Sequence, residues 1–193
     1  MTEATELFAL ADRELWLVTA QHGGNRGGLI ATFVCHASLP PELPRVLIAV
    51  AKQHHTWQLI EQSGAFALHL LREDQVDFVW RFGLQSRRDV DKLAGLATQA
   101  TATGSPRLLD MIGWADCRVE ARWDTGDRTV YLAEIVEARL ENKAAPLTVH
   151  GLLRIAPRDK LEQLRALREQ DSRIDAAAIL AWRKDHGGTA GEA

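Results

Sequence analysis

Cysteines, basic clusters and long apolar runs are all scarce in this sequence of 193 residues, and each scarcity excludes a class of protein. Two cysteines, Cys35 and Cys117, are too few for a disulfide framework or a four-cysteine zinc site, and such low usage is typical of a reducing compartment. The 23 Lys and Arg residues against 26 Asp and Glu residues give a net charge of −3, without the basic face that nucleic-acid phosphates require.

Membrane and export signals are also lacking. No apolar run approaches the roughly 20 residues of a membrane-spanning helix, and the first residues are acidic rather than basic. We therefore expect a cytoplasmic protein that binds neither nucleic acid nor a membrane.

The apolar pattern predicts a chain that is mainly β with helices between the strands. Runs of β-forming residues occupy 15–20, 29–34, 45–51, 65–71, 116–123 and 129–140. Glycine-containing turns at 23–28 and 124–127 join two pairs of these runs into predicted hairpins. The run at 45–51 is continuously apolar, as in a strand buried on both faces. Short strands without regular βαβ alternation favour an antiparallel barrel, closed or partly closed.

Helices are predicted at 56–62, ending at Gly64, and at 74–82, whereas the polar stretch 85–104 is interpreted as an irregular excursion or lid. In the last third, Leu161, Leu164 and Leu167 predict an amphipathic helix. Ser172 and Asp175 have capping-box spacing, which predicts a separate helix through residue 182, followed by a frayed tail at 187–193. We accordingly divide the chain into a barrel domain, residues 1–156, and a C-terminal helical extension, residues 157–193.

The segment 52–56 is a candidate anion site because it lies where a buried strand passes into a helix. Free helix amides, the Lys52 ammonium, the Thr56 hydroxyl and the imidazoles of His54 and His55 can together hold a phosphate. The alternative is an ordinary helix start with solvated side chains. We assign no metal site, because adjacent histidines do not point to one face and no matching His/Cys cluster accompanies them.

Other motifs have simpler interpretations. The glycines at 23, 24, 27 and 28 are followed by a strand and not by a helix, which favours a hairpin over a dinucleotide or P-loop site. Cys35 and Cys117 are either a redox pair or, as we expect, small buried hydrophobes in strands. Since no Gly-x-Ser-x-Gly motif or Ser/His/Asp arrangement is present, we assign no catalytic residue.

Several segments, in their order along the chain, resemble the flavin reductase-like FMN-binding family, and especially the flavin reductase module of diflavin flavoproteins. They are Leu17-Val18-Thr19-Ala20, Ala31-Thr32-Phe33-Val34-Cys35-His36-Ala37-Ser38, Val50-Ala51-Lys52 with Thr56, Ser63-Gly64-Ala65-Phe66, Asp91-Lys92-Leu93-Ala94-Gly95-Leu96, Gly104-Ser105-Pro106-Arg107-Leu108, and Asp116-Cys117-Arg118-Val119 running to Gly126-Asp127. The resemblance covers about residues 14–155, so the helices from residue 159 onward lie outside it.

The resemblance implies an antiparallel split β-barrel that forms a homodimer, with FMN, or alternatively FAD, bound near the subunit interface. It implies the following cofactor-binding residues: Ala31, Thr32 and Phe33 beside the isoalloxazine ring, Cys35, His36 and Ala37 at its pyrimidine end, and Lys52, His54, His55, Thr56 and Lys92 at the ribityl phosphate. Arg128 and His150 are assigned to the nicotinamide side.

The implied activity is that of an NAD(P)H:flavin oxidoreductase, in which the flavin carries the chemistry and free flavin or a redox partner protein receives the electrons. Arg128 stands where relatives often have histidine, which favours the alternative of a non-enzymatic FMN electron carrier reduced by a protein partner. The unusual His54-His55 pair motivates a third alternative, a structural or small-ligand module without flavin. The C-terminal helices are left with three roles: packing on the barrel, extending the dimer interface, or closing over the flavin.

Overall fold

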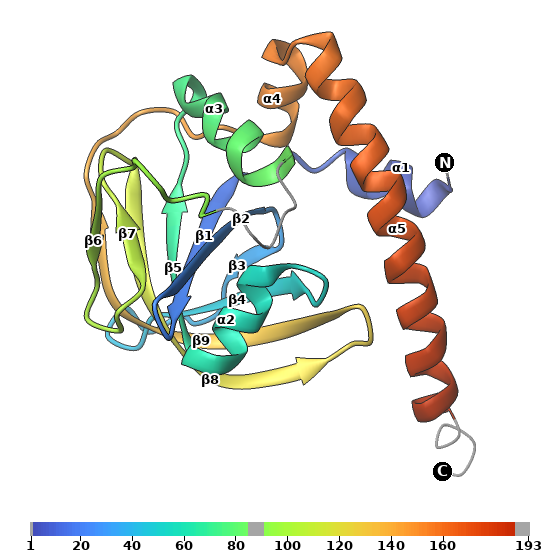
Figure 1. Ribbon diagram of the computed structural model, residues 1–193, viewed down its shortest axis with the longest axis horizontal. Coiled ribbons are helices and arrows are strands. Elements are labelled where there is room, and N and C mark those ends of the chain that lie inside the picture. Colours follow the sequence, from blue (N-terminus) through green and yellow to red (C-terminus); the bar gives the residue numbers. More distant parts are fainter. Residues whose placement is uncertain (1, 85–90, 188–193) are drawn as a thin grey trace.

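The protein is an antiparallel sheet curled into a half-barrel, with helices around it (Figure 1); the computed structural model describes residues 2–84 and 91–187. The seven strands of the main sheet lie in the order β2-β1-β5-β8-β9-β4-β3. Their bounds are β1 (Trp16–His22), β2 (Asn25–Ala31), β3 (Val34–His36), β4 (Arg45–Ala51), β5 (Ala65–Leu70), β8 (Gly113–Asp124) and β9 (Arg128–Leu140). The predicted fold class, a mainly β split barrel with a C-terminal helix, is confirmed.

Smaller elements surround this sheet. Strands β6 (Thr98–Ala100) and β7 (Pro106–Leu108) form a separate two-stranded sheet. The helices are α1 (Glu3–Ala9), α2 (His55–Ser63), η1 (Glu73–Gln75), α3 (Val76–Val79), η2 (Trp80–Leu84), α4 (Val149–Ile155) and α5 (Arg158–His186). Within the described ranges, no helix combines the length and the apolar character needed to cross a membrane.

Both predicted hairpins form. His22 pairs with Asn25 across Gly23 and Gly24, whose φ angles of 56° and 83° suit a two-residue type I′ turn. The predicted connection 23–28 was too long, because β2 begins at Asn25 and runs through the next two glycines. A Cβ atom on Gly28 would lie 2.7 Å from Cε1 of Phe82, so this strand needs glycine for close packing and not for turning.

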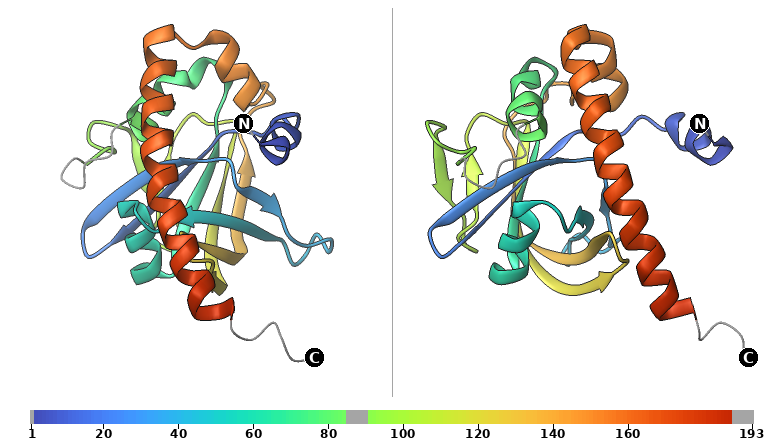
Figure 2. Two further views of the ribbon diagram at one scale, coloured as in Figure 1. Left: turned by 90° about the vertical axis from the view of Figure 1, so that its right-hand side faces the viewer. Right: turned by 45° about the vertical axis from the view of Figure 1, so that its right-hand side comes forward.

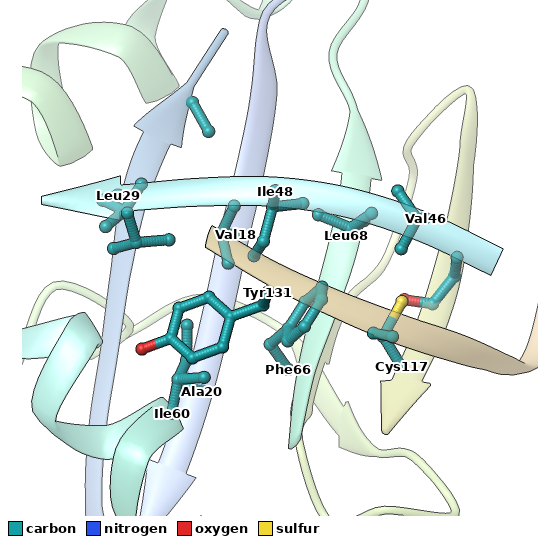
Figure 3. Close-up of a cluster of buried hydrophobic side chains, with 14 of the residues drawn as sticks. Val18, Ala20, Leu29, Val46, Ile48, Ile60, Phe66, Leu68, Cys117 and Tyr131 are labelled. Carbon is teal, nitrogen blue, oxygen red and sulfur yellow. The ribbon is translucent and has the colours of Figure 1, made fainter. Parts of the chain in front are cut away.

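Two apolar clusters stabilise the half-barrel. The first fills the inside of the curl and includes Val18, Ile48, Phe66 and Tyr131 (Figure 3). The second lies on the other side of β1, between β1 and η2, and includes Leu17 of β1 and Phe82 of η2. The residues of β4 alternate between buried and half-buried, because only one face of this strand packs into an apolar cluster, the first one. The prediction that β4 is buried on both faces was therefore wrong.

The helix predictions hold in part. The helix α2 ends as predicted at Gly64, whose φ of 66° is the left-handed conformation of a helix C-cap. The predicted helix 74–82 is divided among η1, α3 and η2. Of the predicted irregular stretch, 85–90 lies outside the described residues and 98–100 forms β6.

The two helices predicted in the last third are one continuous helix, α5, of 29 residues. Ser172 lies in its interior, and Asp175 binds Arg128 of β9, so the predicted capping box was wrong. Figure 2 shows α5 passing along the open edge of the half-barrel. Of the predicted tail, 188–193 lies outside the described residues.

The two cysteines have different environments. Cys117 is buried in the first cluster, where burial raises the pKa of its thiol, as expected for a small hydrophobe. Cys35 is exposed on β3, so the expectation that both are buried was wrong for this residue. The reason is that β3 is the edge strand of the sheet, with β4 as its one neighbour there.

Candidate functional site

A cavity of about 200 Å³ lies at the start of α2, the place where the sequence predicts an anion site. Its lining comes from the β1–β2 hairpin, the beginning of α2, η2, Lys92 and α5. The lining residues are Arg26, Gly27, Gly28, Leu29, Gln53, His54, His55, Thr56, Phe82, Gly83, Lys92, Leu167, Gln170, Asp171 and Ile174. Four predicted phosphate-site residues, His54, His55, Thr56 and Lys92, are therefore brought together.

Glycine gives this cavity its shape. A Cβ atom on Gly27 would lie 2.9 Å from Cδ1 of Leu59 and 3.1 Å from Oγ1 of Thr56. Because glycine has no Cβ, β2 passes directly against the first turn of α2. That approach brings Arg26 of the hairpin to the same cavity as the free amides at the start of α2.

The charged groups on the barrel side are cationic and partly desolvated. Lys92 donates a hydrogen bond from Nζ to the carbonyl oxygen of Phe82 at 2.9 Å, and burial lowers its pKa to about 8. Burial also lowers the pKa of His54, and the positive charges of Lys92 and Arg128 act in the same direction, whereas Asp171 opposes them. Arg26 forms an ion pair with Asp91 at 2.5 Å.

The donor set fits a phosphate. Cationic side chains and the amide groups of a nine-residue helix face one cavity. In addition, the side-chain oxygen Oε1 of Gln53 is buried there without a hydrogen-bond partner among the described residues. A buried polar atom without a partner is uncommon, and a bound polar ligand would supply one after a rotation of the carboxamide.

The segment predicted to lie beside the flavin ring carries an aromatic side chain with two guanidinium groups close to it. Phe33 is half exposed, and its ring centre lies 5.0 Å from Cζ of Arg128 and 5.7 Å from Cζ of Arg13. Arg128 also donates hydrogen bonds to Asp127 at 2.5 Å and to Asp175 of α5 at 2.8 Å. The apolar face of Phe33 suits the planar ring of a ligand, and the two guanidinium groups suit a ligand that also carries negative charge.

The other predicted residues lie apart from the cavity lining. Lys52 forms an ion pair with Asp124 at 2.6 Å, and Cys35 and His36 are exposed on β3. Ala31 ends β2, while Thr32 precedes β3 and Ala37 follows it. His150 of α4 hydrogen-bonds through Nε2 to the carbonyl oxygen of Ala9 and lies 3.8 Å from the Asp12 carboxylate. The cofactor roles of these residues stay predictions.

Sequence reasoning missed several lining residues, namely Arg26, Gln53 and the four residues of α5. Arg26 lies between the glycine pairs 23–24 and 27–28. From the sequence we interpret this segment as a hairpin turn, which gives its cation no role. The signal for α5 was the helical spacing of its leucines, three residues apart, which continues after a four-residue step to Asp171 if the two predicted helices are joined into one.

An antiparallel half-barrel with a cavity lined by basic side chains at the start of α2 defines a split-barrel fold with a candidate anion site. The family model described as "Flavin reductase like domain" matches residues 11–152, so the chain belongs to that family, as its sequence resemblance implies.

Individual relatives agree with this assignment. The chain is 28% identical over 137 residues to diflavin flavoprotein A 1 of Synechocystis, covering 70% of this chain and 24% of that protein. It is 37% identical over 120 residues to the reductase subunit HsaB of a flavin-dependent monooxygenase of Rhodococcus jostii, covering 58% of this chain and 60% of that protein. It thus spans about a quarter of the first relative and under two thirds of the second.

Among solved structures, the styrene monooxygenase flavin reductase of Pseudomonas putida S12 is similar, with a TM-score of 0.64 and 26% identity over 76% of this chain and 91% of that one. The family match ends at residue 152 and so leaves α5 outside.

Proposed function

We propose that the protein is an NAD(P)H:flavin oxidoreductase that uses FMN and works in the cytoplasm. The cationic cavity at the start of α2, in a chain of the flavin reductase-like family, carries this proposal. The cavity suits a terminal phosphate, which FMN has and riboflavin lacks. Two relatives are reductase components of monooxygenases, which supports free flavin or a protein partner as the acceptor of the electrons.

The side chains then bind and position. Arg26 and Lys92 neutralise the phosphate, while the amides of α2 and the His54 imidazole donate hydrogen bonds to it. Phe33 offers an apolar surface at the ring end, and Arg128, next to Phe33, is the residue that we assign to the nicotinamide side. When bound, the flavin supplies the hydride acceptor, and for that reason no side chain of the chain has to act as a general acid or base.

We also propose a homodimer. The helix α1 stands away from the barrel (Figure 2), and Leu7, Phe8 and Leu10 at its end are largely exposed. Phe33 is exposed as well, at the edge of the proposed flavin site. A second copy of the chain would cover these apolar side chains. Light scattering after size exclusion measures the molar mass and so tests the homodimer. A monomer at micromolar concentration contradicts the proposal.

The activity is tested with purified protein reconstituted with FMN, and in parallel with FAD, under anaerobic conditions. Addition of NADH or NADPH should bleach the visible absorbance of the flavin, and readmission of air should restore it. The same flavin and nicotinamide without protein is the control. If the absorbance stays unchanged with both nicotinamides, the proposed activity is wrong.

The alternative of an FMN electron carrier is favoured by one observation. Both Asp127 and Asp175 already bind the Arg128 guanidinium, which leaves it less free to engage a nicotinamide nucleotide. A carrier would hold FMN stably and be reduced by dithionite but not by either nicotinamide. The experiment above distinguishes the two functions.

A further inference from the structure

The inward face of α5 contains two carboxylates within an otherwise apolar stripe. The half-buried residues on this face are Leu161, Leu164, Leu167, Asp171, Asp175, Ala178 and Trp182, and they follow each other at intervals of three or four. Such a stripe is normally apolar where a helix packs against a core. The position of the two aspartates in it therefore needs an explanation.

The two ends of the stripe explain how α5 is held. Leu164 packs against the second apolar cluster beneath η2. At the other end, a Cβ atom on Gly126 of the β8–β9 turn would lie 2.6 Å from Cβ of Trp182, so the helix and the turn are in close contact. Between these contacts Asp175 binds Arg128. The helix is thus attached on both sides of the phosphate cavity.

Asp171 lies over the cavity itself. Asp171 is one of the residues that line the cavity, together with the basic residues Lys92 and His54. Its negative charge raises the pKa of His54 and so opposes the larger lowering by burial. Among residues 2–84 and 91–187, no side chain forms a hydrogen bond or an ion pair with the Asp171 carboxylate.

We infer that Asp171 is a specificity-determining residue that weakens the binding of the flavin phosphate and so makes flavin an exchangeable substrate of this protein. The inference rests on the proposed function. A phosphate that enters the cavity brings a charge of about −2 at neutral pH beside a fixed carboxylate. Like charges at short range in a partly desolvated site repel each other, so part of the attraction of the cations is lost.

This role fits a reductase better than a carrier. A protein that passes reduced flavin to an acceptor has to release it, whereas a carrier has to retain it. Since α5 lies beyond residue 152, the carboxylate is an addition to the part of the chain that the family model matches.

The test compares flavins with and without a phosphate. Dissociation constants for FMN and riboflavin are measured by fluorescence quenching, without nicotinamide, for the wild type, Asp171→Asn and Asp171→Ala. Glu169→Gln is the matched control, because it removes the same charge from an exposed position of the same helix. Thermal unfolding of each variant confirms that it is folded.

We expect both Asp171 variants to bind FMN about tenfold more tightly and to release it more slowly, with riboflavin affinity changed less than twofold. The control should leave both affinities unchanged. If the wild type binds FMN and the Asp171 variants bind it equally or more weakly, the inference is wrong and the proposed function stands. An equal gain for riboflavin also overturns it, since the effect would then not depend on the phosphate. If neither the wild type nor any variant binds a flavin, the proposed function fails and the inference fails with it.

Discussion

Asp175 of α5 accepts a hydrogen bond of 2.8 Å from Nη2 of Arg128 on β9, and this contact ties the last helix to a strand 47 residues earlier. Nε of the same guanidinium donates a hydrogen bond to Oδ2 of Asp127, and the Phe33 ring lies beside the guanidinium. One arginine thus connects three parts of the molecule: the end of the β8–β9 hairpin, the strand segment assigned to the flavin ring, and α5.

The first prediction concerns that contact. Asp175→Asn should lower the free energy of unfolding by about 1 kcal/mol, because both side chains of the ion pair are only about a fifth to a quarter exposed. Hydrogen exchange of the second half of α5 should accelerate. Denaturant unfolding and exchange mass spectrometry measure the two effects, with Glu169→Gln as the control. Unchanged exchange in α5 would show that Arg128 does not hold the helix.

The second prediction concerns the glycines of β2. Gly28→Ala places a methyl group 2.7 Å from Cε1 of Phe82 and should destabilise the protein by about 1–3 kcal/mol, since the ring has to move. Gly83→Ala is the matched control, because its nearest contacts would be 3.9 Å away. Urea unfolding of the two variants measures the difference. Equal stability of both would contradict the close packing of β2 against η2.

The third prediction is a pH dependence of FMN binding. The pKa of Lys92 is lowered by burial to about 8, so the side chain loses its positive charge as the pH rises through that value. The FMN dissociation constant should therefore increase several-fold from pH 7 to pH 9, a range in which the flavin phosphate stays a dianion. In Lys92→Arg the charge is retained and the dependence should disappear. A dependence that survives in this variant would assign it to another group.

The fourth prediction concerns His69, which is fully buried and neutral. Its Nδ1 donates a hydrogen bond to the carbonyl oxygen of Leu17, and its Nε2 accepts one from the backbone N–H of Leu108, each at 3.0 Å. Burial is the main cause that lowers its pKa from 6.5 to about 4. Between these values the unfolded chain binds a proton that the folded protein does not, so stability falls as the pH drops from about 6.5 to 4, by roughly 3 kcal/mol.

His69→Gln removes the titrating group and should flatten this part of the stability curve. The same change at the exposed His22 is the control. Unfolding free energies at several pH values between 4 and 7 provide the measurement. If the curve of His69→Gln is as steep as that of the wild type, the acid sensitivity comes from other groups.

Local patterns in the sequence determined most of the sheet. The hairpin at Gly23 and Gly24, the end of α2 at Gly64 and the β8–β9 hairpin follow from turn chemistry and from alternating residues, which act over a few neighbouring positions. The prediction of an anion site at the start of α2, where the structure has a cavity, rests on the same kind of signal, since the strand, the helix start and the polar side chains are adjacent in the chain.

Tertiary structure decided the rest. No local signal shows that Lys52 pairs with Asp124, that Arg26 reaches the cavity from another hairpin, or that Ser172 lies inside one long helix instead of beginning a second. These outcomes depend on contacts between segments far apart in the chain, where packing and charge pairing outweigh local propensity. The sequence by itself determined a cysteine-poor split barrel and predicted an anion site at the start of α2, and only the packing of α5 against the barrel brought Asp171 to the cavity there.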